Sequence, residues 1–241
     1  MLRAIVASIF VLLLFPTSGR AESPLLLQIV ELPPYMIVES PTSISGLVID
    51  PALAALRKAG IAFQWQIVPA VRQLVRIKSN QERVCSLGWY KTPNREKFAK
   101  YSRPIVKDSG YAGFANNQYR PGDGVSLDVV LNDPEVTVLI KIGFVHGEYL
   151  DARLANMKAN SEFTYADMPL IFKMVAAGRA QITFAPLAEI RYYENLGVVS
   201  KDEFHVMMFK EMPSTGVYRY MMCSQKVEDE LIKRFNATLG K

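Results

Sequence analysis

The sequence predicts an α/β protein with two lobes, each a mostly parallel sheet flanked by helices, joined by two hinge crossings of the chain. Apolar runs suited to buried strands alternate with amphipathic helical segments, an order typical of parallel sheets covered by helices. A stretch rich in Gly, Asn and Pro at residues 109–124 looks like a connection between lobes and divides the alternation into two sets. A strand and a helix remain after the second set, and we place them back on the first lobe.

The first set has the order strand, helix, strand, helix, strand. Gly60 closes its first helix, because glycine is the usual residue just past a helix end. The expected elements lie at residues 25–32, 46–60, 63–68, 71–80 and 84–89.

The second set mixes strands with longer helical patterns. Its expected elements are a strand at 136–145, helices at 148–160 and 168–178, a strand at 181–185, a helix at 187–197 and a strand at 204–212. The remaining pair is a strand at 217–224 and a helix at 227–239. We therefore expect lobe 1 to comprise residues 22–112 and 213–241, and lobe 2 to comprise residues 113–212.

Residues 1–21 have the features of a secretory signal peptide. Arg3 precedes an apolar run at residues 5–15, and Gly19 and Ala21 stand at the −3 and −1 positions of a small-residue cleavage site. The run is shorter than the about 20 residues that a transmembrane helix needs, which disfavours the alternative of an N-terminal anchor. We expect a mature chain that starts near Glu22 and is exported to the periplasm.

The composition argues against nucleic acid and against a metal or cofactor site. The net charge is +5 over 241 residues with both signs interspersed, so no basic surface for nucleic acid is indicated. His146 and His205 are the two histidines, and neither a Gly-x-Ser-x-Gly nor a His-Glu-x-x-His motif occurs. We expect a monomer that is not an enzyme and uses no cofactor and no metal.

The segment Thr92-Pro93-Asn94-Arg95 combines three features that suit an anion. Thr is a favoured N-cap and Pro is favoured at the first helical position, so a helix is expected to begin here. A helix N-terminus carries a partial positive charge, and the Arg95 guanidinium can bind a carboxylate through two parallel hydrogen bonds. The alternative is an ordinary capped helix with Arg95 in a surface ion pair.

Two aromatic residues are further candidates for a ligand site. Tyr35 and Trp89 are expected near the carboxyl ends of strands, where open α/β sheets bind ligands. Aromatic rings at that edge can stack on an apolar or cationic ligand. The alternative for both is core packing.

Four motifs of the first lobe resemble those of the type II periplasmic solute-binding proteins, closest to the family-3 group that includes the polar amino-acid binders of ABC importers. The motifs are Pro34-Tyr35, Gly46 to Asp50 before a helix, Thr92 to Arg95, and Tyr101-Ser102 with Pro104. The resemblance implies a cleft that captures a small, carboxylate-bearing molecule, amino-acid-like or an organic acid, for delivery to an inner-membrane transporter permease. It also implies that Arg72 faces this cleft, with Lys91 and the capping Thr92 near it.

The second lobe departs from this pattern. Amino-acid binders of the family have an Asp that holds the ligand ammonium, and in "GRAQITFAPLAEI" that position is Pro186. Glu189 is near in sequence but is expected to point from the following helix. The turn at Gly147 opens a helix and offers backbone N–H groups, and Glu148 there suits a cationic group.

Two other functions on this fold stay open. One is a ligand-sensing module that serves a membrane receptor. The other is a dehydratase-like periplasmic enzyme, for which Glu31, Glu148 or Asp167 would be the acid or base.

The two cysteines are expected to form a disulfide. Cys85 lies in the strand before the proposed site, and Cys223 lies in the late strand that we place on the same lobe. An exported location permits the bridge. The alternative is a pair of buried free thiols.

Overall fold

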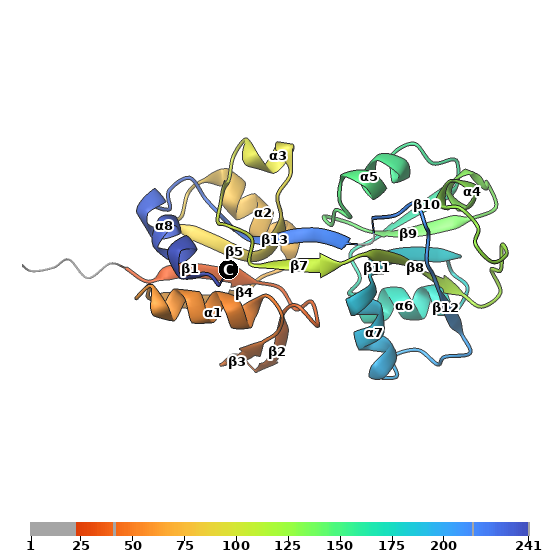
Figure 1. Cartoon of the computed structure of the whole chain (residues 1–241), viewed down its shortest axis with the longest axis horizontal. Helices are drawn as coiled ribbons and strands as arrows, with labels where there is room; N and C mark the ends of the chain where they lie inside the picture. Colours follow the sequence, from red (N-terminus) through yellow and green to blue (C-terminus); the bar gives the residue numbers. More distant parts are fainter. Residues whose placement is uncertain (1–22, 41, 214, 241) are drawn as a thin grey trace, which may run out of the picture.

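The computed structural model describes residues 23–40, 42–213 and 215–240, so the predicted signal peptide lies outside the described residues. The chain forms two lobes side by side, each with its own sheet and helices (Figure 1). Within the described ranges, no helix has the length and apolar character needed to cross a membrane. The predicted α/β fold of two lobes is confirmed.

Lobe 1 is built on a sheet whose first three strands are parallel, whose fourth strand runs antiparallel to them, and whose last two strands pair antiparallel with the fourth. The order along the sheet is β4 (Phe63–Ile67), β1 (Leu25–Ile29), β5 (Val84–Tyr90), β13 (Thr215–Cys223) and β6 (Lys100–Tyr101), with β7 (Val106–Ser109) also paired to β13. The other elements are the hairpin β2 (Ile37–Ser40) and β3 (Ser43–Ser45) and the helices α1 (Ile49–Lys58), α2 (Ala70–Ser79), α3 (Pro93–Glu96) and α8 (Asp229–Thr238).

Lobe 2 is a second sheet with helices on both faces, α4 and α5 on one and α6 and α7 on the other (Figure 1). The strand order is β10 (Asn160–Thr164), β9 (Thr137–Lys141), β11 (Ile182–Pro186), β8 (Tyr111–Asn116) and β12 (Phe204–Met207). The helices are α4 (Leu127–Asn132), α5 (Glu148–Leu154), α6 (Met168–Ala176) and α7 (Leu187–Asn195).

Each lobe has a close-packed interior. In lobe 1, Leu25, Leu27 and Ile29 of β1 are completely buried. In lobe 2, the Phe114 ring of β8 stacks on the rings of Phe172 and Phe204, with both centroid separations at 4.4 Å. These contacts make each sheet a rigid support for the loops at the lobe boundary.

The segment predicted as a connection between the lobes contains the strand β8 (Tyr111–Asn116). β7 ends at Ser109 and β8 begins at Tyr111, so the first crossing is a single residue, and β8 then runs through the sheet of lobe 2. Gly113 is typical of a loop, but here it permits close packing of β8 against Ile182. A Cβ atom on residue 113 would lie 2.7 Å from the Cδ1 atom of Ile182. The predicted helix at 148–160 is also shorter than expected, and it is followed by the unpredicted strand β10.

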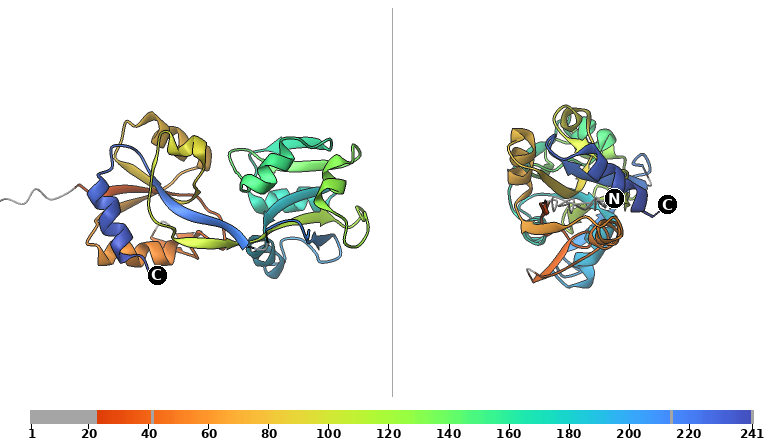
Figure 2. Two further views of the ribbon diagram at one scale, coloured as in Figure 1. Left: turned by 45° about the horizontal axis from the view of Figure 1, so that its top comes forward. Right: turned by 90° about the vertical axis from the view of Figure 1, so that its left-hand side faces the viewer.

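The C-terminal strand and helix return to lobe 1. β13 runs beside β7 between the two lobes, and α8 packs against α1 (Figure 2). The Thr238 hydroxyl donates to the Ala55 carbonyl at 2.8 Å, which fixes α8 on α1.

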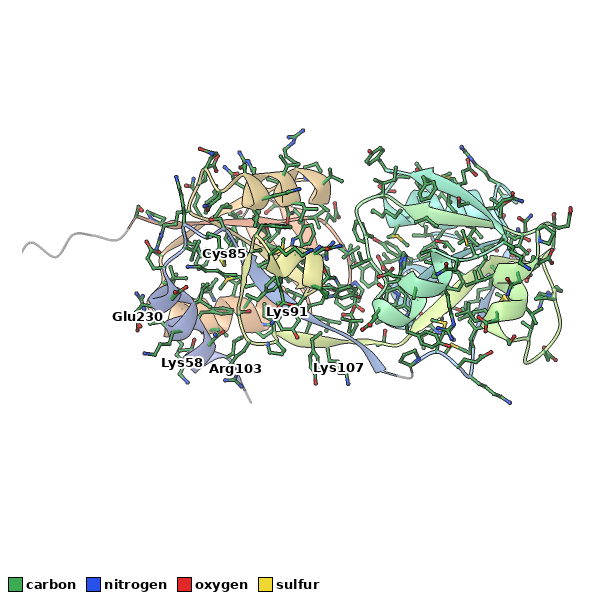
Figure 3. The ribbon with its side chains drawn as sticks, turned by 90° about the horizontal axis from the view of Figure 1, so that it is seen from above. Lys58, Cys85, Lys91, Arg103, Lys107 and Glu230 are labelled. Atoms are coloured by element: carbon green, nitrogen blue, oxygen red, sulfur yellow. A yellow bond between two sulfur atoms is a disulfide. The ribbon has the colours of Figure 1, made fainter. Side chains whose placement is uncertain are left out.

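The predicted disulfide joins Cys85 of β5 to Cys223 of β13 inside lobe 1 (Figure 3). The two residues face each other in the antiparallel register, with Cα atoms 4.0 Å apart and 138 positions between them in sequence. The bridge therefore ties the returning strand to the parallel core of the sheet.

Candidate ligand-binding cleft

A hollow opens where the two lobes meet, with a volume of about 430 Å³ that includes the part open to solvent. Lobe 2 contributes the turn Gly143–Val145 after β9. Lobe 1 contributes the apolar residues Val30, Leu32, Met36, Ala70 and Leu87, the β5 end Gly88–Tyr90, and two arginines, Arg95 and Arg219. We call this hollow the cleft.

Arg95 is held in the cleft wall by a short capped helix. The Thr92 hydroxyl accepts the backbone N–H of Arg95 at 3.3 Å, and Pro93 occupies the first helical position, as the sequence predicts. The Arg95 residue is only 8% exposed, and its Nη1 donates to the Tyr90 carbonyl at 3.1 Å. Burial lowers the pKa of Arg95, but a guanidinium stays charged in proteins. In the described part of the chain, it forms no ion pair.

The Trp89 ring packs against one face of the Arg95 guanidinium. The guanidinium carbon lies 4.6 Å from the centre of the Trp89 ring, a cation–π contact. The ring is fixed in turn, because its Nε1 donates to Gln73 at 3.0 Å and the Gln73 amide donates to the Val68 carbonyl at 2.7 Å. A chain of buried hydrogen bonds therefore sets the position of Arg95.

Arg219 of β13 is a cleft residue that the sequence did not single out. It forms an ion pair with Asp108 of β7 at 2.7 Å and donates to the Gly88 carbonyl at 2.9 Å. Its guanidinium carbon also lies 4.0 Å from the centre of the Tyr35 ring and 4.7 Å from that of Tyr90. These partners use most of its donors within the protein itself.

A pair of tyrosines connects the lobes beside the cleft. The hydroxyls of Tyr90 in lobe 1 and Tyr111 in lobe 2 lie 3.1 Å apart, and the Tyr111 hydroxyl donates to the Val145 carbonyl at 3.4 Å. The Tyr90 hydroxyl donates to Asp108, the partner of Arg219. Burial raises the pKa of Tyr90 and of Tyr111, so both remain neutral hydroxyls. The network therefore runs from the ion pair of lobe 1 to the lobe 2 turn.

Sequence comparisons find no matching family model and no matching curated protein. Solved structures do match over nearly the whole chain. An ancestral arginine-binding protein bound to arginine is 17% identical and has a TM-score of 0.71, covering 90% of this chain and 91% of that one. A Salmonella typhimurium periplasmic binding protein with high arginine specificity is 17% identical with a TM-score of 0.67, covering 90% and 91%. The chain has the two-lobed fold of the periplasmic binding proteins.

The GluR0 ligand-binding core from Nostoc punctiforme in complex with L-glutamate shares this fold. It is 20% identical, with a TM-score of 0.66, and the match covers 90% of this chain and 91% of that one. At these identities the likeness concerns the arrangement of the lobes.

On this periplasmic-binding-protein fold, the predicted site residues fall in different places. Trp89 and Arg95 line the cleft together, and Tyr35 is buried behind it against Arg219. Arg72 is exposed on α2, and the Lys91 ammonium forms an exposed ion pair with Glu96 at 2.8 Å beside α3 (Figure 3).

Gly147 and Glu148 lie in a neighbouring hollow, next to Tyr111 and Val217, and not in the cleft itself. Asp167 caps α6 by accepting the Leu170 N–H at 3.0 Å. The sequence predicts ligand contact for Gly147 and Glu148, and Asp167 is one of its three candidates for a catalytic acid or base.

Glu189 of α7 is a buried acid near the lobe boundary. The residue is 3% exposed, and its Oε1 has no hydrogen-bond partner among the described residues. Burial raises the pKa of Glu189 to about 7, although the charges of Arg219 and Lys141 act in the opposite direction. Glu189 therefore favours its neutral form more than an ordinary carboxyl does.

Proposed function

We propose that this protein is a periplasmic solute-binding protein that captures a small, carboxylate-bearing molecule between its lobes and delivers it to an inner-membrane transporter. The observation that carries the proposal is Arg95, a buried guanidinium in the cleft wall. It forms no ion pair in the described part of the chain, although the charge of Asp151 in lobe 2 acts on it. A buried charge is costly unless it is paired. A ligand carboxylate is the group that would pair it.

The geometry leaves Arg95 able to receive such a ligand. One face of the guanidinium rests on Trp89, and one nitrogen is used by the Tyr90 carbonyl. The remaining N–H groups are available for a carboxylate, which a guanidinium binds well through a planar pair of hydrogen bonds.

Closure of the lobes would couple binding to delivery. The cleft is lined from lobe 1 and from the Gly143–Val145 turn of lobe 2, so a ligand contacts both lobes only when they are together. Such a ligand favours the closed state, and a membrane partner can then distinguish loaded from empty protein. The likeness to periplasmic binding proteins for amino acids supports this role.

A ligand-sensing module is the second candidate. The same closure would report a ligand to a membrane receptor, and the likeness to the GluR0 ligand-binding core favours this possibility. The two functions share the ligand site and differ in the membrane partner.

The test is a thermal-shift screen of the mature protein against amino acids, organic acids, peptides and polyamines, followed by calorimetry on each hit. We expect carboxylates to raise the melting temperature and to be recovered unchanged after denaturation of the complex. A hit that is chemically converted would favour the enzyme hypothesis. A screen in which no carboxylate binds would contradict the proposal.

A further inference from the structure

We infer that the ligand is a small monocarboxylate with an apolar body and no ammonium group, such as an aryl- or alkyl-substituted carboxylic acid. This inference rests on the proposed function, because it specifies the ligand of the same cleft. It follows from the charges of the cleft lining, from its apolar walls and from the position and protonation of the nearest acidic side chains.

The charged side chains of the lining are both guanidinium groups, Arg95 and Arg219. Asp108 neutralises Arg219, and the two oxygens of Asp108 are used by Arg219 and by the Tyr90 hydroxyl. Within the lining, the charge that has no ion-pair partner in the described part of the chain is therefore that of Arg95, on which the Asp151 carboxylate acts from outside the lining. One carboxylate matches it, and a zwitterion would bring a second cation into the same positive field.

The walls around Arg95 are apolar on both lobes. Leu32, Met36 and Leu87 come from lobe 1, and Phe144 and Val145 come from lobe 2. Burying hydrocarbon against such side chains is favourable, whereas an ammonium that loses its water there needs a hydrogen-bonding or acidic partner. The lining thus favours an aromatic or branched aliphatic body attached to the carboxylate.

Three acids near this region are not part of the cleft lining: Asp151, Glu189 and Glu31, the last of which is exposed between the lining residues Val30 and Leu32. Asp151 of α5 accepts the backbone N–H of His146 at 2.9 Å and lies 3.1 Å from its ring nitrogen Nδ1. Glu189 lies outside the cleft lining and, as described above, is shifted toward protonation by burial. None of these acids belongs to the lining, so the apolar walls themselves offer no acidic partner to a ligand ammonium.

The test uses matched ligands that differ only in one charged group. Calorimetry of the mature protein would compare 3-phenylpropionate, L-phenylalanine and 2-phenylethylamine, and then 4-methylpentanoate, L-leucine and 3-methylbutylamine. We expect at least one of the two carboxylates without an amino group to bind at least tenfold more tightly than its amino acid, and neither amine to bind. An amino acid that binds as tightly as its deaminated partner would overturn this inference while leaving solute binding intact.

A variant pair tests the lining itself. Val145→Asp places an acid on the apolar wall, and Val145→Asn is its neutral control of the same size. The ratio of amino-acid to deaminated-acid affinity should rise at least tenfold in the Asp variant relative to the Asn variant. Equal ratios in the two variants would count against the inference, and thermal melts of both variants would confirm that they fold. If no carboxylate of either series, and no solute in the wider screen, binds the unaltered protein, the proposed function fails together with the inference.

Discussion

Asp108 and Arg219 form a buried ion pair between the strand by which the chain leaves lobe 1 and the strand by which it returns. The Arg219 Nε and Asp108 Oδ1 atoms are 2.7 Å apart, and the Asp108 side chain is completely buried. Two aromatic rings, those of Tyr35 and Tyr90, flank the guanidinium. The pair therefore fixes β7 and β13 to each other at the base of the cleft.

Replacing Asp108 by Asn should strongly destabilise the protein. The substitution leaves the Arg219 charge buried without its counter-charge, and breaking a buried pair in this way costs about 3–5 kcal/mol. Urea denaturation would measure the loss. The matched control is Asp128→Asn, which breaks the exposed pair with Arg153 at 3.3 Å and should cost less than about 1 kcal/mol. Similar losses in the two variants would show that the buried pair has no special role.

Arg95→Lys should weaken binding of a carboxylate ligand although the charge is kept. A lysine ammonium offers neither the planar pair of hydrogen bonds nor the flat face that rests on Trp89. The loss of binding free energy should not exceed the about 2–5 kcal/mol that truncation of one partner of a buried charge pair costs. Calorimetry would measure it, with Arg57→Lys on the exposed surface of α1 as the control. Unchanged affinity in both variants would remove Arg95 from the ligand site.

Glu189 should make stability depend on pH. Its pKa of about 7 in the folded protein exceeds the ordinary value of 4.5, so folding favours the protonated form. As the pH rises, Glu189 loses its proton at a lower pH in the unfolded chain than in the folded protein. The free energy of unfolding therefore falls between about pH 4.5 and about pH 7. Glu189→Gln removes the titration. The variant should match the unaltered protein near pH 4 and exceed its stability by about 3 kcal/mol at pH 8, at 1.36 kcal/mol per pKa unit.

Urea denaturation at pH 4 and pH 8 would check this expectation. The control is Glu135→Gln, at an exposed position, for which the difference from the unaltered protein should be the same at both pH values. A constant difference for Glu189→Gln as well would mean that the buried carboxyl is not protonated on folding.

The disulfide should contribute substantially to the stability of lobe 1. Closing a loop of 138 residues lowers the entropy of the unfolded chain, with an effect of about 5 kcal/mol in the chain-entropy model and often less in practice. The double substitution Cys85→Ser and Cys223→Ser should lower the urea midpoint, and reduction of the unaltered protein should have the same effect. Rapid alkylation of two thiols in the native, unreduced protein would contradict the bridge.

Local features of the sequence were sufficient for much of lobe 1. Gly60 has a φ of +62°, a conformation that glycine adopts easily, and it ends α1 where the sequence predicted. Thr92 caps α3 as expected. These predictions succeeded because each depends on the chemistry of neighbouring residues.

The features that sequence analysis missed depend on contacts between distant parts of the chain. Asp108 and Arg219 are 111 positions apart, and no local pattern connects them. β8 was missed because its Gly and Asn residues are typical of loops, whereas Gly113 is required by the close approach of Ile182. The state of Glu189 follows from its burial, which becomes known only when the lobes are assembled.

The position of β13 between β5 and β6 determines the order in which the two lobes can complete their sheets during folding. The sheet of lobe 2 comes from one unbroken stretch, residues 111–207, whereas the sheet of lobe 1 lacks an inner strand until residues 215–223 are available. A chain that folds from its N-terminus therefore completes its second half first and holds its first half with an unpaired strand edge. Cys85 lies on that unpaired edge, and its disulfide with Cys223 can form only after β13 has paired with β5. Oxidation of the two cysteines therefore reports that the sheet of lobe 1 is complete.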